Sequence, residues 1–365
     1  MTNFLYTLTI IPSGKFLKSE KTGQTRGKGG SVALKIIVLN QADMQKVFTM
    51  KDAVQADKDA LRMYSEGMTN IPLRANLDVP KHEGQSLYMC GYAEPAGALG
   101  VKIVSVYPKN IEKGLTSVPA MMVLVNDETG EVCSVMDGTF LTRIRTGAIS
   151  GAATDELARK DSKVFALFGT GGQAETQLEA VLTVRPIELV KVFGLNADRT
   201  KNFAERMTKK FDGRFGVKII AAQSPEDALE DADVITAVTT AKSAVFDGRL
   251  VKKGAHINGV GSYTPEMAEI DEYIVTHADK VYVDTRDGCF SESGDLIQPI
   301  KKGVFSEGRV TGQLGEVLAG KVPGRESDSE MTFFKTTGSA VLDIVTAKRI
   351  YECALKQGIG GVLDM

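Results

Sequence analysis

Apolar residues between positions 35 and 137 come in short runs that turn signals separate. Runs of this kind are typical of strands, which we expect at 35–39, 86–89, 100–106, 121–125 and 132–137. Residues 52–66 instead carry apolar side chains at helical spacing, and a second helix is predicted over 145–160. The first part of the chain therefore predicts a mainly antiparallel or mixed sheet packed against helices.

The rhythm changes at residue 161, where strands and helices begin to alternate. Residues 164–168 (VFALF) form a continuous apolar run, as expected of a parallel strand buried on both faces. A glycine turn and a helix follow this strand. Further strands are predicted at 189–193, 217–220, 234–238, 256–260 and 281–284, and further helices at 199–211 and 225–230. This alternation predicts an α/β fold with a Rossmann-type, doubly wound parallel sheet.

A chain of 365 residues is long enough for two domains. An amphipathic helix predicted over 338–357 lies beyond the alternating region and can pack back on the first half. We therefore expect residues 35–155 and 331–365 to form one discontinuous α+β domain, and residues 156–330 to form the Rossmann domain. Residues 1–34 are predicted to be an extension outside the fold; their basic bias leaves a transit peptide as the alternative.

Composition excludes several classes of function. The 44 basic and 46 acidic side chains give a net charge of −2, without the basic excess of a nucleic-acid-binding domain. The mean hydropathy is −0.07, and no apolar stretch is long enough to span a membrane. The four cysteines form no CxxC pair and the three histidines no HExxH motif, so we expect no metal. A cytoplasmic protein is expected.

A glycine-rich loop follows the apolar strand at 164–168 and opens a helix. Its pattern is GxGxxA, in which the first glycine permits a tight turn and the second lets a pyrophosphate approach the backbone. The helix N-terminus then offers free N–H groups to the phosphates. The predicted cofactor-binding residues of this loop are Gly169, Thr170, Gly171, Gly172, Gln173 and Ala174.

The end of the second strand bears on the choice of dinucleotide. An acidic residue there binds the ribose 2′-hydroxyl of NAD, but this chain has Gly194 at that position. Asn196 and Arg199 favour a 2′-phosphate, whereas Asp198 keeps the NAD alternative open. The expected cofactor is NAD(P)(H), leaning towards NADP(H).

Four motifs in fixed order carry a resemblance that the glycine loop alone does not. They are RTGA at 145–148, HINGVG at 256–261, SESGD at 291–295 and GEV at 315–317. Together with the loop they resemble the ornithine cyclodeaminase/mu-crystallin family over residues 36–360. The resemblance implies a homodimer, with substrate and dimer contacts in the first domain and the cofactor in the cleft beside the Rossmann domain. It also implies cofactor contacts from Thr146, Val260 and Gly261.

The family acts at one carbon–nitrogen centre, so it needs a carboxylate anchor and a route for a proton. The resemblance implies that Arg74 and Arg145 hold the carboxylate and that Lys102 moves the proton. Lys102 also stands out by itself, because a lysine inside an apolar strand needs a partner or a function. Met89 and Tyr263 are implied at the substrate and Asp295 at the cleft, although Gly-Asp is also an ordinary turn or cap signal.

Two departures from the family pattern bear on the reaction. Tyr263 stands where ornithine cyclodeaminases carry an aspartate, and Leu87 replaces a glutamate of theirs. A phenol is a poor general base at neutral pH, which weakens ring-closing deamination. We therefore expect an NAD(P)(H)-dependent oxidoreductase of a small L-amino acid or cyclic imino acid, resembling the pyrroline-2-carboxylate reductase-like and alanine dehydrogenase-like members. The alternatives are ornithine cyclodeaminase and a non-catalytic, NADPH-dependent binding protein like mu-crystallin. Glu269 is expected to be solvated.

Overall fold

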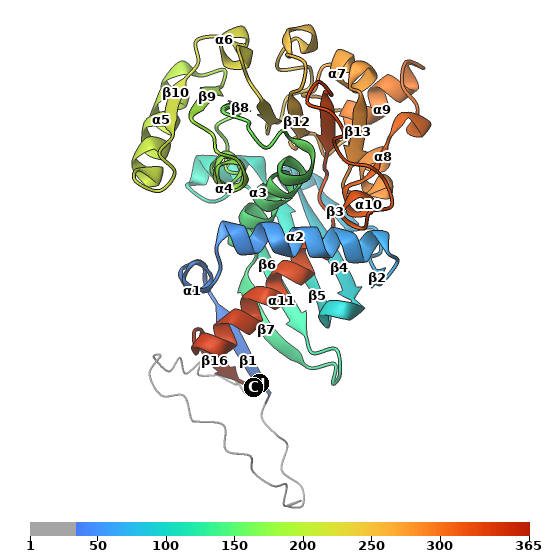
Figure 1. The fold of residues 1–365 in the computed structure, drawn as a ribbon. Helices are drawn as coiled ribbons and strands as arrows, with labels where there is room; N and C mark the ends of the chain where they lie inside the picture. The colour runs from blue at the N-terminus through green and yellow to red at the C-terminus, as the bar shows by residue number, and fades with distance from the viewer. Residues whose placement is uncertain (1–33) are drawn as a thin grey trace, which may run out of the picture.

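The computed structural model describes residues 34–365, which form two units, one above the other in Figure 1. The first unit is built on an eight-stranded mixed sheet in the order β16-β1-β7-β6-β5-β4-β2, with β3 paired to β4. Its strands are β1 (Lys35–Leu39), β2 (Thr69–Asn70), β3 (Ala75–Val79), β4 (Gly84–Ala93), β5 (Ala98–Val106), β6 (Ala120–Val125), β7 (Val132–Asp137) and β16 (Gly361–Asp364). The meander from β4 to β7 is antiparallel and β1 joins it in parallel, as the sequence predicts.

Helices α1 (Gln41–Val47), α2 (Met50–Ser65) and α11 (Ala340–Gln357) belong to this unit. Figure 1 shows α2 and α11 crossing one face of the sheet. Thr49 starts α2 with a capping box, in which its side chain accepts from the backbone N–H of Asp52. The C-terminal helix therefore packs on the first half of the chain, as its amphipathic pattern predicts.

The opposite face of the same sheet carries apolar side chains in contact with solvent. Leu77, Tyr88, Ile103 and Met121 come from four neighbouring strands and are 37% to 57% exposed. The register places Tyr88 opposite Ile103 and Ile103 opposite Met121, so these side chains share one face. Exposed apolar side chains that share one sheet face are typical of a protein–protein contact.

The second unit contains a parallel eight-stranded sheet in the order β10-β9-β8-β11-β12-β15-β13-β14. Its strands are β8 (Val164–Phe168), β9 (Leu189–Phe193), β10 (Lys218–Ala221), β11 (Val234–Ala237), β12 (His256–Gly259), β13 (Lys280–Val283), β14 (Gly312–Gln313) and β15 (Thr332–Lys335). The first five in this spatial order match the doubly wound dinucleotide-binding topology. The fold class predicted from the sequence is confirmed.

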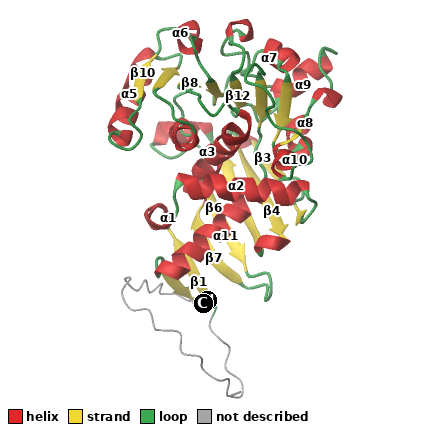
Figure 2. Cartoon of the chain, in the orientation of Figure 1, coloured by secondary structure: helices red, strands yellow, loops and turns green. Residues whose placement is uncertain are grey.

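Helices flank the strands of this second sheet (Figure 2). They are α4 (Ala174–Val184), α5 (Ala197–Phe211), α6 (Pro225–Leu229), α7 (Glu272–His277), α8 (Arg286–Glu292), α9 (Gly294–Lys301) and α10 (Leu314–Leu318). Short 3-10 turns complete both units: η1 (Pro80–His82), η2 (Glu94–Ala96), η3 (Pro108–Lys113), η4 (Gly248–Leu250) and η5 (Glu307–Arg309).

Helix α3 (Gly138–Leu157) connects the two units and is buried along most of its length. A Cβ on Gly147 would lie 2.4 Å from the Thr176 carbonyl oxygen, so glycine is what lets α3 approach α4 this closely. The helix begins at Gly138, seven residues before the predicted start. The sequence prediction missed its first two turns because Asp137 caps the helix directly at the end of β7.

Strand β15 changes the predicted domain boundary. Residues 332–335 pair in parallel with both β12 and β13, inside the second sheet. All four residues of the strand are buried, because a central strand of a doubly covered sheet meets protein on both faces. The chain therefore returns to the first unit after Lys335, later than the predicted position 331. The predicted extension at 1–34 lies, apart from Leu34, outside the described residues.

Among residues 34–365, no helix combines the length and the apolar character that crossing a membrane requires.

Candidate active site

A buried ion cluster lies between the sheet and helices of the first unit. The Lys102 ammonium on β5 is 2.8 Å from Asp343 Oδ1 and 2.7 Å from Asp343 Oδ2. Arg145 Nε on α3 is also 2.8 Å from Asp343 Oδ1. Lys102 and Asp343 are fully buried and Arg145 nearly so. One carboxylate therefore bridges two of the predicted catalytic cations, and the three groups keep one net positive charge.

The surroundings of Lys102 favour a neutral amine at moderately alkaline pH. Burial lowers the pKa of Lys102 to about 7, the Arg145 charge acts in the same direction, and Asp343 opposes both. Asp57 on α2 adds a further buried carboxyl group, whose pKa burial raises well above its usual range. Lys102 can therefore hold or release a proton near neutral pH, as a general acid or base must.

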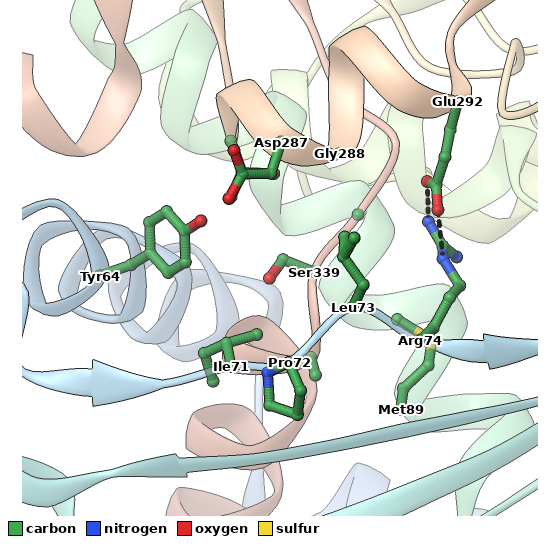
Figure 3. A pocket seen from close by; sticks show the side chains of 13 residues that line it. Tyr64, Ile71, Pro72, Leu73, Arg74, Met89, Asp287, Gly288, Glu292 and Ser339 are labelled. Carbon is green, nitrogen blue, oxygen red and sulfur yellow. Dashed lines mark hydrogen bonds and ion pairs between the residues drawn. The ribbon is translucent and has the colours of Figure 1, made fainter.

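A pocket opens beside this cluster, between the two units (Figure 3). Its cavity volume is about 50 Å³, it is open to solvent, and the N-terminus of α11 reaches it at Gly338, Ser339 and Ala340. The first-turn N–H groups of a helix have no partner within the helix and attract anions. A Cβ on Gly338 would lie 2.6 Å from Arg145 Nη1, and its φ is +78°. Glycine at this position lets the chain pass directly over the guanidinium.

Arg74 lines the same pocket but is paired across the cleft. It donates through Nε (2.8 Å) and Nη2 to the two carboxylate oxygens of Glu292 on α8, in a forked arrangement drawn in Figure 3. Forked guanidinium–carboxylate pairs are specific in geometry as well as strong. Binding of a substrate carboxylate by Arg74 remains a prediction, because the Glu292 carboxylate occupies its guanidinium here.

Met89 lines this pocket, and Tyr263 lies within range of the Arg74 charge. Met89 is a lining residue, sits opposite Lys102 on the neighbouring strand and is 3% exposed. Tyr263 follows β12 and is partly buried; burial raises the pKa of its phenol, and the charge of Arg74 lowers it. A phenol with a raised pKa stays protonated at neutral pH, so Tyr263 can donate a hydrogen bond but is a poor base.

The glycine loop has the geometry of a phosphate-binding turn. Gly169 has φ +113°, and a Cβ there would lie 2.6 Å from the Val238 carbonyl oxygen. No atom lies within 4 Å of a Cβ built on Gly171 or Gly172, so their backbone faces open space. Gln173 stands at the N-cap position of α4 and Ala174 is the buried first residue. These residues fit the pyrophosphate of a dinucleotide at a helix N-terminus.

A second hollow adjoins this loop and the start of α5. Its lining residues are Thr170, Gly171, Gly172, Arg199, Asn202, Phe203 and Arg206. Asn196 is the N-cap of α5 and accepts from the backbone N–H of Arg199 at 2.8 Å, so its side-chain oxygen is occupied by helix capping. The two guanidinium groups beside the glycine loop make this hollow suitable for an anion.

Thr146, Val260 and Gly261 are predicted to contact the cofactor. A backbone group of each already makes a hydrogen bond within the protein. The Thr146 carbonyl accepts from Gln177 Nε2 at 2.6 Å. The N–H groups of Val260 (3.0 Å) and Gly261 donate to Glu269 Oε1. Val260 and Gly261 directly follow β12 of the second sheet, whereas Thr146 lies on α3. Their contact with a cofactor remains a prediction.

A second buried ion cluster contradicts one expectation, the solvation of Glu269, and contains Asp295. Glu269 is fully buried rather than solvated, and its other oxygen accepts from Thr239 N at 2.7 Å and Thr239 Oγ1 at 2.9 Å. Asp295 Oδ1 accepts from Glu269 N (2.8 Å) and Ile270 N (3.0 Å), and Lys335 Nζ lies 3.0 Å from Asp295 Oδ2. Asp295 is 2% exposed and holds the loop after β12. It therefore braces this loop, and its predicted catalytic role remains a prediction.

Sequence reasoning missed Asp343, Glu292 and Arg206. Asp343 had a detectable signal, since it is a charged residue on the apolar side of the predicted C-terminal helix. Glu292 lies inside the SESGD motif, but only the tertiary structure brings it to Arg74, 218 residues earlier in the chain. Arg206 lies two helical turns after Arg199 on α5, and helical spacing places the two on one side.

The fold and the two sites together define a dinucleotide-binding α/β protein with a second small-molecule pocket at the domain cleft. Residues 35–358 match the model of the ornithine cyclodeaminase/mu-crystallin family, and the chain belongs to that family. The resemblance recognised from the motifs is confirmed.

Several similar proteins align with nearly the whole length of this chain. A Delta(1)-pyrroline-2-carboxylate reductase of Bacillus cereus is 36% identical over 90% of this chain and 100% of its own length. An alanine dehydrogenase of Archaeoglobus fulgidus is 34% identical over 90% of this chain and 98% of its own. The Delta(1)-pyrroline-2-carboxylate reductase of Thermococcus litoralis, solved in complex with NADH and L-proline, is 42% identical with a TM-score of 0.85, covering 89% of this chain and 99% of that one.

The bridging carboxylate leads to a stability prediction. Asp343→Asn leaves two buried cations without their counter-ion, and loss of one partner of a buried pair costs about 3–5 kcal/mol. We expect a loss of this size in the free energy of unfolding, measured by chemical denaturation. The double variant Asp343→Asn/Lys102→Met is expected to lose less than the sum of the two single changes, because it also removes one of the stranded cations.

A surface pair provides the control for this measurement. Glu83→Gln removes an exposed partner of Lys109 and is expected to change stability by no more than about 1 kcal/mol. Equal losses for Asp343→Asn and Glu83→Gln would contradict the bridging role of Asp343.

Proposed function

We propose that the protein reduces a small cyclic imino acid, such as pyrroline-2-carboxylate, to the L-amino acid with a nicotinamide cofactor. The observation that carries the proposal is Lys102, a buried amine with a pKa of about 7 beside Arg145 and an anion-attracting helix end. The similarity to two named pyrroline-2-carboxylate reductases over the full length of the fold supports it. An alanine dehydrogenase-like reaction is the second candidate, supported by the archaeal relative.

The mechanism follows from the pocket and from the buried cations Lys102 and Arg145 beside it. A bound nicotinamide supplies the hydride that reduces the C=N bond. Arg145 and the N-terminus of α11 attract the substrate carboxylate. Lys102, as the ammonium, donates a proton to the imine nitrogen, since an amine with this pKa is substantially protonated at neutral pH. In amino-acid oxidation the neutral amine of Lys102 takes the proton back.

The first test follows turnover and its dependence on Lys102. Purified protein with NADPH or NADH is expected to consume cofactor steadily with pyrroline-2-carboxylate, monitored by absorbance at 340 nm. Lys102→Met is expected to lower kcat by roughly 100-fold or more, the size of a lost general acid, while cofactor binding persists. The rate of imine reduction is expected to fall as pH rises through about 7, because the ammonium form of Lys102 is lost there.

Two other substrates separate the alternatives. Pyruvate with ammonia tests the alanine dehydrogenase reaction. Proline and ammonia formed from L-ornithine, with no net change in absorbance, would identify a cyclodeaminase and refute the reductase. Tight NADPH binding without turnover of any of these compounds would identify a binding protein.

We further propose that the cofactor is NADP(H). Arg199 and Arg206 line the hollow beside the glycine loop, and Gly194 leaves no acidic residue directly after β9 to repel a 2′-phosphate. The solved relative from Thermococcus litoralis binds NADH, so this preference would be a property of the present chain.

Arg199→Ala tests the cofactor preference. Loss of a guanidinium–phosphate contact is expected to raise KM for NADPH roughly 10-fold and to leave KM for NADH nearly unchanged. Lys209→Ala, at an exposed position of the same helix, is the matched control and is expected to change neither value. Equal effects of Arg199→Ala on both cofactors, or a wild-type preference for NADH, would contradict the assignment.

We also propose that the protein is a homodimer that pairs through the exposed face of the first sheet. The exposed side chains of Leu77, Tyr88, Ile103 and Met121 share this face, and a second copy can bury them.

Ile103→Glu places a charge in the centre of this face and is expected to convert the dimer to a monomer, measured by light scattering after gel filtration. Leu250→Glu introduces the same charge at an exposed apolar position of the second unit and is expected to leave the dimer intact. A monomeric wild-type protein, or a dimer that survives Ile103→Glu, would refute this interface.

A further inference from the structure

The pocket between the two units has a second polar side, away from the Arg74–Glu292 pair. Tyr64 from the last turn of α2, Asp287 from α8 and Ser339 at the start of α11 all line it. Figure 3 shows the phenol, the carboxylate and the hydroxyl pointing into the same space, with Arg74 on the other side. These three groups play no part in the proton transfer described above. Ser339 is buried, Tyr64 is partly buried and Asp287 is exposed.

Ser339 is the most informative of the three. It is only 8% exposed, it stands at the N-cap position of α11, and its hydroxyl does not make the capping hydrogen bond that serine usually makes there. Within residues 34–365 the hydroxyl has no hydrogen-bond partner. The hydroxyl is not among the fully buried polar atoms without a partner, so it is open to the pocket, where water or a bound molecule can bind it. Its direction into the pocket indicates that a bound molecule can do so.

Tyr64 and Asp287 extend this side of the pocket. Neither side chain makes a hydrogen bond or ion pair within the described part of the chain. Burial raises the pKa of the Tyr64 phenol, and the charges of Asp287 and Asp284 raise it further, so the phenol keeps its proton and Asp287 lies close enough to influence it. An ionised carboxylate can only accept hydrogen bonds, whereas both hydroxyls can donate or accept. The ligand group that satisfies all three must therefore be a hydrogen-bond donor.

We propose that the substrate carries, besides its carboxylate, a second hydrogen-bond-donating group that Asp287, Tyr64 and Ser339 bind. The substrate class is a cyclic imino acid, or its reduced amino acid, with a hydroxyl or ammonium substituent on the ring carbons away from the carboxylate. The inference rests on the proposed function, since it names the substrate of the same pocket. Asp287 is exposed and Tyr64 is partly buried, so water binds these groups when the ring is unsubstituted. A ring substituent that replaces this water with direct hydrogen bonds is favoured over a ring that lacks it.

The test compares ring substituents in the oxidative direction. Wild-type protein with NADP⁺ is assayed on L-proline, on both 4-hydroxy-L-proline epimers and on both 4-amino-L-proline epimers. At least one substituted compound is expected to exceed L-proline in kcat/KM roughly 5-fold or more, the size of one or two net hydrogen bonds. A larger gain for the amino compounds identifies an ammonium substituent, and a larger gain for the hydroxy compounds identifies a hydroxyl.

Variants assign the preference to these residues. Asp287→Asn and Tyr64→Phe are each expected to reduce the ratio of kcat/KM between substituted and plain proline at least 3-fold. Ser339→Ala provides a third, small change should either of these fail to fold. Asp212→Asn and Tyr273→Phe make the same chemical changes at exposed positions outside the pocket and are expected to leave the ratio unchanged.

The outcomes separate this inference from the proposed function. Turnover of L-proline as good as that of every substituted compound would overturn the inference and leave the reductase assignment standing. A wild-type preference that survives Asp287→Asn, Tyr64→Phe and Ser339→Ala would also overturn it, because another part of the pocket would then select the substituent. No turnover of any cyclic amino or imino acid would refute the proposed function itself.

Discussion

The carboxylate of Asp343 is the constraint on which the catalytic half of the molecule depends. Lys102 and Arg145 come from a strand and a helix far apart in sequence, and neither cation can be buried without a counter-ion. Asp343 lies 2.7–2.8 Å from both, in the first turn of α11, where a negative charge also interacts favourably with the helix dipole. Because one anion serves two cations, a positive charge remains beside the pocket.

The C-terminal segment couples this cluster to the nucleotide-binding unit. Strand β15 lies in the centre of the second sheet and ends at Lys335, which faces Asp295. Asp284 then accepts from Thr336 Oγ1 and from the N–H groups of Thr337 and Gly338, fixing the turn that leads into α11. The short segment 335–343 therefore carries Lys335, the cation of one buried cluster, and Asp343, the anion of the other. The relative position of cofactor edge and substrate pocket follows from that connection.

Local patterns predict much of this architecture and fail at identifiable places. The apolar strand, the glycine loop and the helix after it can be recognised because each depends on neighbours within a few residues. Strand β15 was missed because four residues are too few to show a strand pattern by themselves. The strand is defined by pairing with two partner strands, β12 and β13. Glu269 was misjudged because a glutamate near the end of a motif is usually solvated; here four donor groups and Lys335 compensate its burial.

The sequence by itself determined the class of fold, the turn for the cofactor phosphates and the identity of the cations Lys102 and Arg145. These features rest on residue type and short-range spacing, which the chain carries whether folded or not. Only the tertiary structure decided which charges meet: that Asp343 bridges two cations, that Glu292 holds Arg74, and that Asp295 braces the loop after β12. Such pairings join residues that are distant in sequence, and the cost of burying an unpaired charge selects among them only once the chain has folded.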